Sequence, residues 1–312
     1  MRARLIAAFA AVYLVWGSTY LAIRFAVETI PPFLMAGSRF ILSGLILLAW
    51  ARWFERAPVP SRVDWRTGLI SGGLLLLGGN GAVAWSEQRV PSGIAALLVA
   101  IVPLWMVLLE WLRPGGRRPT VAVFAGVSLG LVGLLLLVGP DALRGHGGSD
   151  AVGAVVLVLA SLSWAAGSLY TKWAPRASSG TIGAGTQMLA GGALLIIAGL
   201  AFGEPSHLDL ARVSSRSFLG FLYLVTFGSL IGFTAYLYLL AHTTAAKAAT
   251  YAYVNPVVAV LLGWAIGHEP VTTRTLLAAA VILAGVAIIT VTRDGAPRSV
   301  ATTTSDSESA VA

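Results

Sequence analysis

The chain has 312 residues, of which 57% are hydrophobic and only 11% are charged, and its formal net charge is +8. A soluble globular protein carries roughly 25% charged residues, so this composition excludes an ordinary water-soluble domain and indicates a chain embedded in a lipid bilayer. The absence of cysteine excludes disulfides, thiol catalysis and cysteine-based metal or iron–sulfur centres.

Apolar segments follow one another along the whole chain, each close to the ~20 residues that cross the hydrocarbon core as a helix. They cover residues 5–26, 33–53, 67–87, 92–112, 121–139, 152–172, 181–202, 217–240, 247–267 and 273–291. Residues 293–312 are small, polar and hydroxyl-rich, and we expect them to form a disordered cytoplasmic tail. The pattern predicts an all-α integral membrane protein with ten transmembrane helices.

Lys and Arg residues are distributed unevenly between the two sides of these segments. If the N-terminus is cytoplasmic, fourteen of them fall on the cytoplasmic side and five on the outer side. This asymmetry follows the positive-inside rule, so we expect both termini to be cytoplasmic in a plasma or bacterial inner membrane. Because the basic charge is an orientation signal, we expect no nucleic-acid partner.

A sequence repeat relates the fourth and ninth segments. Ala95–Leu109 recurs 153 residues later as Ala248–Leu262, with six identities in fifteen positions. A five-helix unit that is repeated once lies upside down in its second copy, because an odd number of crossings reverses the side. We therefore expect two inverted five-helix repeats, 5–139 and 152–291, an arrangement that recurs in secondary transporters. Both halves are in one chain, so a monomer is sufficient, and an oligomer stays open.

Polar side chains inside hydrocarbon are costly and usually face a cavity or one another. Arg39 lies about six residues into the second segment, ~10 Å along the helix axis. Arg39 has a role in binding a solute, or it has a structural role. In the structural role it extends to the outer interface or pairs with Glu28. Asn80, between Gly79 and Gly81, either presents its carboxamide to a cavity at a pliant point of the third segment or bonds a neighbouring helix.

Proline interrupts the fourth and ninth segments at matching places. Pro256 follows Asn255, and a proline frees a backbone carbonyl one turn earlier and bends the helix. Pro103 is its counterpart, with Val102 where Asn255 stands. Broken helices at corresponding positions of two halves indicate a transport site, so we assign both prolines a helix-breaking and gating role.

The chain resembles the EamA-type family of the drug/metabolite transporter superfamily from about Leu5 to Thr292. The resemblance rests on Trp16-Gly-Ser-Thr-Tyr20, Pro31-Pro32, Arg39, Gly79-Asn80-Gly81, Pro91-Ser92-Gly93, Ala95-Ala96, Pro103, Ser163-Trp164 and the run from Tyr251 to Val260. It implies two inverted five-helix repeats around a central cavity. It also implies movement of small metabolites, such as amino acids, related solutes or drugs, often outward, by alternating access.

We expect a substrate cavity lined by aromatic, amide and hydroxyl groups. Its candidate residues are Trp16, Tyr20, Arg39, Asn80, Trp164, Tyr251 and Asn255. An arginine beside such a cavity suits a carboxylate-bearing or zwitterionic solute. The expected partners are this small-molecule substrate and the bilayer, and we expect no cofactor, metal or catalytic residue.

The sequence allows more than one coupling mechanism and two alternative functions. Glu110 is the acid clearly inside a segment, so either it carries a coupling proton or the protein is a facilitator or exchanger. A passive channel is a second reading, disfavoured because the unequal counterparts Val102 and Asn255 do not form a symmetric pore ring. A membrane-embedded enzyme is less favoured, because the histidines are scattered along the chain.

Overall fold

The computed structural model describes residues 2–86, 98–116, 118–143, 151–175, 177–258 and 272–291, and its ordered elements there are helical. The longer helices are α1 (Arg2–Ala26), α2 (Pro32–Trp53), α3 (Arg62–Gly72), α6 (Val102–Leu112), α7 (Val121–Leu143), α8 (Ala151–Trp173), α9 (Gly180–Ala201), α10 (Ser215–Tyr223), α11 (Thr234–His242) and α14 (Thr273–Val291). The shorter elements are α4 (Ala82–Ser86), α12 (Ala245–Ala249), the π-helical segments η1 (Gly73–Gly81) and η4 (Leu224–Phe233), and the 3₁₀ turns η2 (Glu204–His207) and η3 (Leu210–Arg212).

Several of these helices are long and apolar enough to cross a membrane. Within the described residues they are Pro32–Trp53, Arg62–Ser86, Val152–Trp173, Gly180–Ala201 and Ser215–His242. Shorter apolar helices cover Val102–Leu112, Val121–Leu136 and Thr273–Ile289. These ranges overlap the apolar segments expected from the sequence, and the described part of the chain is all-helical.

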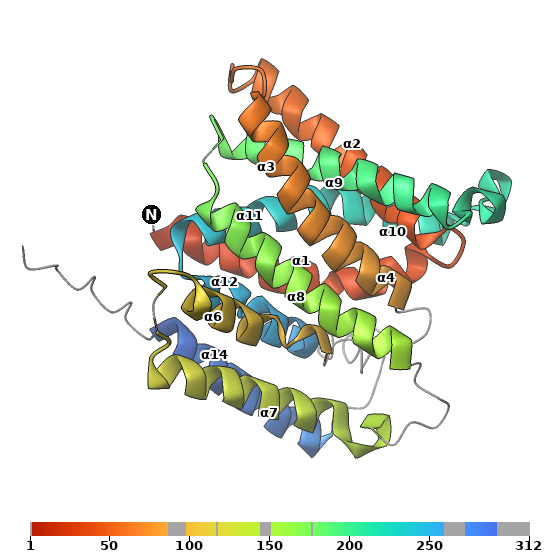
Figure 1. Ribbon diagram of the computed structural model, residues 1–312. Coiled ribbons are helices and arrows are strands. Elements are labelled where there is room, and N and C mark those ends of the chain that lie inside the picture. The colour runs from red at the N-terminus through yellow and green to blue at the C-terminus, as the bar shows by residue number, and fades with distance from the viewer. Residues whose placement is uncertain are drawn as a thin grey trace, which may run out of the picture.

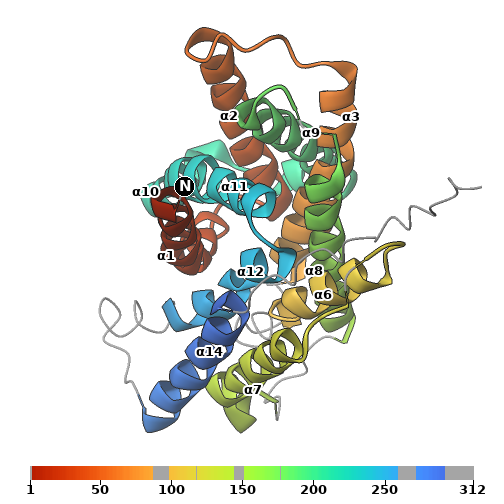
Figure 2. The same cartoon turned by 90° about the vertical axis from the view of Figure 1, so that its left-hand side faces the viewer.

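The helices stack in a defined order between two sides of the molecule. In Figures 1 and 2, α2, α3 and α9 lie together at the top and α7 and α14 lie together at the bottom, with the remaining helices between them. The pairs α2 with α9 and α7 with α14 are in contact along their lengths. Each pair joins a helix of residues 1–143 to one of residues 151–291, so the two parts of the chain interdigitate.

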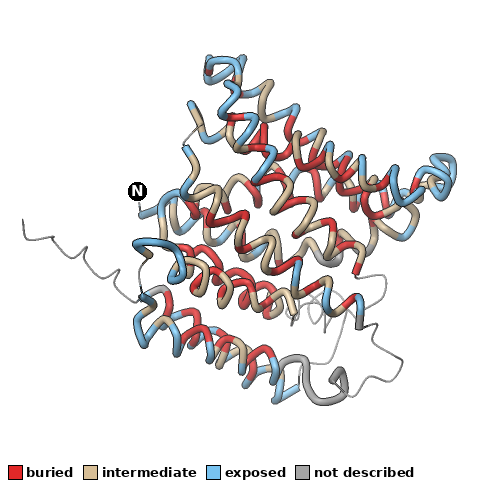
Figure 3. The backbone as a smooth tube through the Cα atoms, in the orientation of Figure 1, coloured by how far each residue is buried: buried red, intermediate tan, exposed pale blue. Residues whose placement is uncertain are grey.

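Burial follows the sides of the helices that face one another. Figure 3 shows buried residues in stripes on the inner sides of the helices and exposed residues on the outer sides. Large apolar side chains such as Leu45, Leu159 and Leu276 are exposed on the outside. An exposed apolar exterior of this extent suits lipid contact, because monomeric soluble proteins rarely present large apolar patches.

An α–π–α order occurs twice in the described chain. The first run is α3, η1 and α4, and the second is α10, η4 and α11. Ser61 and Ser214, 153 residues apart, cap the two runs by accepting a hydrogen bond from Asp64 N at 3.2 Å and Ser217 N at 3.1 Å. π-Helical turns are rare and are frequently found at functional sites, so η1 and η4 are candidate parts of such a site.

The helices next to these runs also correspond. Helix α8 packs against α3, η1 and α4, and α1 packs against α10, η4 and α11. The first helix of each half therefore lies along the α–π–α run of the other half. Close approach is allowed between α2 and α9 because Gly37 and Gly192 face each other: a Cβ on Gly192 would lie 2.9 Å from the Gly37 carbonyl oxygen.

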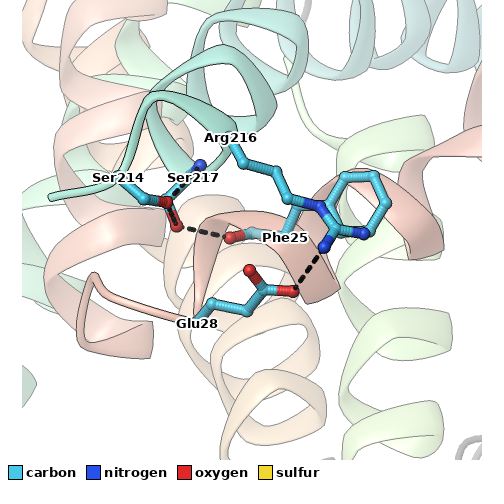
Figure 4. A network of polar contacts seen from close by, with 5 residues as sticks. All are labelled: Phe25, Glu28, Ser214, Arg216 and Ser217. Atoms are coloured by element: carbon cyan, nitrogen blue, oxygen red, sulfur yellow. Dashed lines mark hydrogen bonds and ion pairs between the residues drawn. The ribbon is translucent and has the colours of Figure 1, made fainter.

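One end of the helix bundle is held by polar contacts between α1 and α10, drawn in Figure 4. Arg216 Nη1 lies 3.7 Å from Glu28 Oε1, and its guanidinium lies over the Phe25 ring at 3.7 Å. Ser217 Oγ donates to the Phe25 carbonyl oxygen at 2.7 Å. These contacts join the end of α1 to the start of α10.

Candidate functional site

A cavity of about 110 Å³ lies at the centre of the helix bundle, large enough for several water molecules. Its walls come from both halves of the chain. The lining residues are Trp16, Thr19, Ile23, Arg39, Phe40, Gly79, Asn80, Val83, Val99, Val102, Ala160, Ser161, Trp164, Gly228, Phe233, Tyr251 and Asn255. We refer to it as the central cavity.

The central cavity brings together candidate residues that are far apart in sequence. Six of the seven candidate substrate residues line it, namely Trp16, Arg39, Asn80, Trp164, Tyr251 and Asn255. The seventh, Tyr20, belongs to α1, and its side chain lies outside the part of the chain that the structure describes. The structure thus supplies one common location for side chains from five helical elements.

Aromatic rings form a compact cluster along one side of the cavity. Trp16 contacts Trp164 edge to face with ring centroids 5.7 Å apart, and contacts Tyr251 edge to face at 4.9 Å. Tyr236 lies 5.1 Å from Trp16 and 5.7 Å from Trp164. Edge-to-face pairs are favoured by the ring quadrupoles, so this cluster holds the tryptophan rings in fixed orientations.

Both tryptophans lie directly against the π-helical segments. Trp16 Nε1 donates to the Gly228 carbonyl oxygen in η4 at 3.1 Å. A Cβ on Gly232 in η4 would lie 2.5 Å from Trp16 Nε1, and one on Gly79 in η1 would lie 2.8 Å from Trp164 Cε3. Glycine is therefore needed at both places to admit a tryptophan of the opposite half.

Arg39 is buried in α2, with 4% of its surface exposed, and reaches the central cavity. Its guanidinium lies over the Phe40 ring at 4.1 Å, and Nε has no hydrogen-bond partner among the described residues. The alternative pairing with Glu28 is wrong, because Glu28 faces Arg216.

The two asparagines present different surroundings. Asn80 lies in η1 and lines the cavity, and its side chain forms no hydrogen bond within the described chain. In the amide orientation that satisfies both groups, Asn255 Nδ2 donates to the carbonyl oxygens of Tyr13 at 3.3 Å and Tyr251 at 3.1 Å. Asn255 therefore ties its helix to α1, whereas the Asn80 amide remains available to a solute.

A helix begins beside Pro103, as predicted, but the helix is not interrupted at Pro256. α6 begins at Val102 with Pro103 in its first turn, after a turn at residues 100–101. In the ninth segment the helix continues through Pro256 to residue 258, and the interruption lies earlier, at Thr250. Tyr13 Oη and Thr250 Oγ1 are 2.6 Å apart, so a hydrogen bond from α1 supports this turn.

A second cavity, of about 490 Å³, contains Glu110. It is bounded by the C-terminal ends of α8 and α11, by α12 and by the segment before α7. Its charged lining residues besides Glu110 are Arg118, Lys172 and Lys247. Lys172 Nζ donates to the carbonyl oxygens of Leu240 and Thr243, which closes the end of α11. Glu110 Oε2 is buried without a hydrogen-bond partner in the described chain.

Two contributors to the site were missed from the sequence. Tyr236 is fully buried, and its hydroxyl bonds Ser168 Oγ at 2.6 Å and accepts from Trp164 Nε1 at 3.2 Å. Ser161, a cavity-lining residue, accepts from Trp105 Nε1 at 3.1 Å. A buried tyrosine in the eighth segment and a serine three residues before Trp164 were the available signals. Among the described residues, no group of three metal-ligating side chains comes together.

Comparison with known proteins agrees with this architecture. The inner membrane transporter YedA of Escherichia coli (strain K12) is 40% identical over 288 residues, covering 92% of this chain and 90% of YedA. PagO of Salmonella typhimurium is 27% identical over 300 residues, and the transporter YoaV of Bacillus subtilis is 25% identical over 282 residues. The alignments cover 92% of this chain and 92% of PagO, and 90% of this chain and 94% of YoaV.

A solved crystal structure shares the fold, with a TM-score of 0.74 and 23% identity, covering 93% of this chain and 97% of that one. The model of the EamA-like transporter family matches residues 3–139 and again residues 151–291. With both matches together spanning most of its length, the chain belongs to the EamA-like transporter family.

Proposed function

We propose that this protein carries small organic solutes outward across a cell membrane by alternating access, with the central cavity as the substrate site. The observation that carries the proposal is the convergence of Trp16, Arg39, Asn80, Trp164 and Tyr251 on one internal cavity. An internal cavity with a few polar groups among aromatic walls is the usual form of a small-molecule site.

The transport mechanism follows from the relation between the halves. We propose ten transmembrane helices in two inverted repeats, residues 5–139 and 152–291, with residues 293–312 as a cytoplasmic tail. The support is the doubled α–π–α run and its matching partners α8 and α1. Two similar halves around one site exchange conformations, which opens the site to each side in turn. A single chain contains both halves, so we expect the monomer to be competent.

The two ends of the bundle differ in a way that suits outward transport. Contacts among Phe25, Glu28 and Arg216 hold one end of α1. The 490 Å³ cavity lies near the opposite end, among the C-terminal residues of α8 and α11. We propose that this end is cytoplasmic, as the positive-inside pattern predicts, and that solutes enter there. Both chain termini are then cytoplasmic.

Glu110 is the candidate for proton coupling. It faces the second cavity, and its Oε2 has no hydrogen-bond partner among the described residues. Lys172, Lys247 and Arg118 line the same cavity. We propose that Glu110 carries the coupling proton during the transport cycle. A facilitator or exchanger that lacks this step is the competing mechanism.

The absence of native cysteine allows a direct test of the pathway. Ser161 lines the central cavity, whereas Leu159, two residues away in α8, is 57% exposed on the outer surface. Ser161→Cys and Leu159→Cys are treated with a membrane-impermeant thiol reagent in inside-out and in right-side-out vesicles. The lipid-facing control, Leu159→Cys, should be unreactive from both sides.

A carrier that rests open to the cytoplasm predicts fast labelling of Ser161→Cys from the cytoplasmic side. Labelling from outside should be slower and should fall more steeply on cooling, because it needs a conformational change. Equal rates from both sides at all temperatures would indicate a channel open at both ends. No labelling from either side would remove the central cavity from the solute pathway.

A further inference from the structure

The central cavity contains a positive charge with no compensating charge among the residues that the structure describes there. Arg39 is the one charged side chain among its described lining residues, and it is 4% exposed. Its side chain forms no hydrogen bond or ion pair in the described chain, apart from the contact of its guanidinium with the Phe40 ring at 4.1 Å. A buried charge without a partner is costly and is rare inside a membrane unless it has a role in binding.

The other polar groups of α2 and its neighbours do not pair with the Arg39 guanidinium. Ser43 Oγ donates to the Arg39 carbonyl oxygen at 2.9 Å, which leaves the guanidinium untouched. Glu28, the acid at the end of α1, faces Arg216. Glu204 accepts from the backbone nitrogens of Phe33 and Leu34 at 3.0 and 2.8 Å. These acids are therefore engaged elsewhere.

The other residues that line the cavity indicate which further groups the ligand has. The carboxamide of Asn80 has no hydrogen-bond partner in the described chain, so it can donate to or accept from a solute. The rings of Trp16, Trp164 and Phe233 provide flat apolar surfaces. A guanidinium opposite aromatic walls fits a small molecule that has one carboxylate and an apolar body, because arginine binds carboxylates with two parallel hydrogen bonds.

The charged residues that line the second cavity are also mostly positive, like Arg39 in the central cavity. Arg118, Lys172 and Lys247 outnumber Glu110 among its charged lining residues. A basic entrance with low-dielectric walls raises the local concentration of anions and speeds their arrival. An anionic solute would therefore meet favourable potential both at this entrance and at Arg39.

We infer that the protein binds small organic carboxylates in the central cavity, with Arg39 as the group that holds the carboxylate. This inference rests on the proposed transport function and names the substrate class of that site. Small aromatic and medium-chain acids have the expected form, in contrast to neutral amides of equal shape and to inorganic anions.

The test uses the full-length protein purified in detergent. Its apparent melting temperature is measured with sodium benzoate against benzamide and with sodium hexanoate against hexanamide, at equal concentration and ionic strength. Sodium chloride and sodium phosphate serve as inorganic anions. A ligand that binds the folded protein raises the melting temperature by mass action, and we expect a rise of about 3 °C for a saturating carboxylate and none for its amide.

Two variants assign this effect to the guanidinium. In Arg39→Gln the carboxylate shift should disappear, and Arg39→Lys should keep a smaller shift because it retains charge without the paired donors. Arg216→Gln is the matched control, since Arg216 also lies over a ring but is 61% exposed and faces Glu28. Its carboxylate shift should equal that of the wild type.

The ligand-free proteins provide a second measurement. Removal of an uncompensated buried charge should leave the melting temperature of Arg39→Gln equal to or above that of the wild type. A fall of several degrees would mean that Arg39 is a structural residue and would overturn the inference. It would also be overturned if the carboxylates give no shift, if amides or inorganic anions match them, or if Arg39→Gln keeps the shift. None of these results bears on the Ser161→Cys labelling, so the inference and the transport proposal fail separately.

Discussion

Trp16 and Trp164 meet edge to face in the centre of the molecule, with ring centroids 5.7 Å apart. Trp16 comes from α1 and Trp164 from α8, the first helix of each half. Each ring also lies against a glycine in the π-helical segment of the opposite half, Gly232 for Trp16 and Gly79 for Trp164. The two halves are therefore joined at the cavity by the same kind of contact, made once in each direction.

The hydrogen bonds of the two indoles differ, and this difference predicts unequal effects of one substitution. Trp16→Phe leaves the Gly228 carbonyl oxygen without its donor, whereas in Trp164→Phe the Tyr236 hydroxyl keeps its bond to Ser168. The loss of ring volume is the same in both. We expect Trp16→Phe to be the less stable variant by about 0.5–1.5 kcal/mol. Thermal unfolding in detergent measures this, and equal melting temperatures would contradict it.

Addition of one methyl group at the tryptophan–glycine contacts should be damaging. In Gly79→Ala the new Cβ would lie 2.8 Å from Trp164 Cε3, and in Gly232→Ala it would lie 2.5 Å from Trp16 Nε1. We expect each variant to lose about 1–3 kcal/mol of stability. Gly73→Ala is the control in η1, because its Cβ meets only Leu194 Cδ1 at 3.4 Å. If all three variants have the same melting temperature, the contacts are not tight.

Glu204 holds the start of α2 from the segment after α9. Its carboxylate accepts from Phe33 N at 3.0 Å and from Leu34 N at 2.8 Å, at the positive end of the helix dipole. We expect Glu204→Gln to lower stability by about 1–2 kcal/mol. Glu28→Gln, which removes a half-exposed carboxylate 3.7 Å from Arg216, should have an effect within about 0.5 kcal/mol. A larger loss of stability for Glu28→Gln than for Glu204→Gln would contradict this prediction.

The coupling proposal predicts the phenotype of Glu110→Gln. In proteoliposomes loaded with a solute that stabilises the protein, this variant should lose accumulation driven by a pH gradient. Exchange of labelled for unlabelled solute needs no net proton movement and should persist. If proton-driven accumulation survives in Glu110→Gln, Glu110 does not carry the proton and the protein is coupled elsewhere or not at all.

Composition and hydropathy were sufficient to predict an all-helical membrane protein, since each apolar segment carries its own signal. The candidate cavity residues were also accessible, because polar and aromatic groups such as Arg39 and Asn80 stand out in apolar helices. Their common location was not a property of any single segment. It depends on how α1, α2, η1 and α8 pack together.

Other features needed the three-dimensional structure. The π-helical form of Gly73–Gly81 was not predicted, and this segment is bonded to α8, where Ser163 Oγ donates to the Leu74 carbonyl oxygen at 2.8 Å. The pairing of Glu28 with Arg216, and not with Arg39, depends on where α10 begins, because this places Arg216 beside Glu28. Tyr236 was overlooked because a tyrosine in an apolar helix also suits a plain packing role.

The inverted relation of the halves is tested most directly by the side of the membrane on which matched residues lie. Arg62 and Ser215 begin α3 and α10, are 153 residues apart and are both exposed. In whole cells, an impermeant maleimide should label Ser215→Cys and leave Arg62→Cys unlabelled, and inside-out vesicles should give the reverse. Labelling of both residues from the same side would mean that the halves are parallel, which would contradict alternating access by inverted repeats.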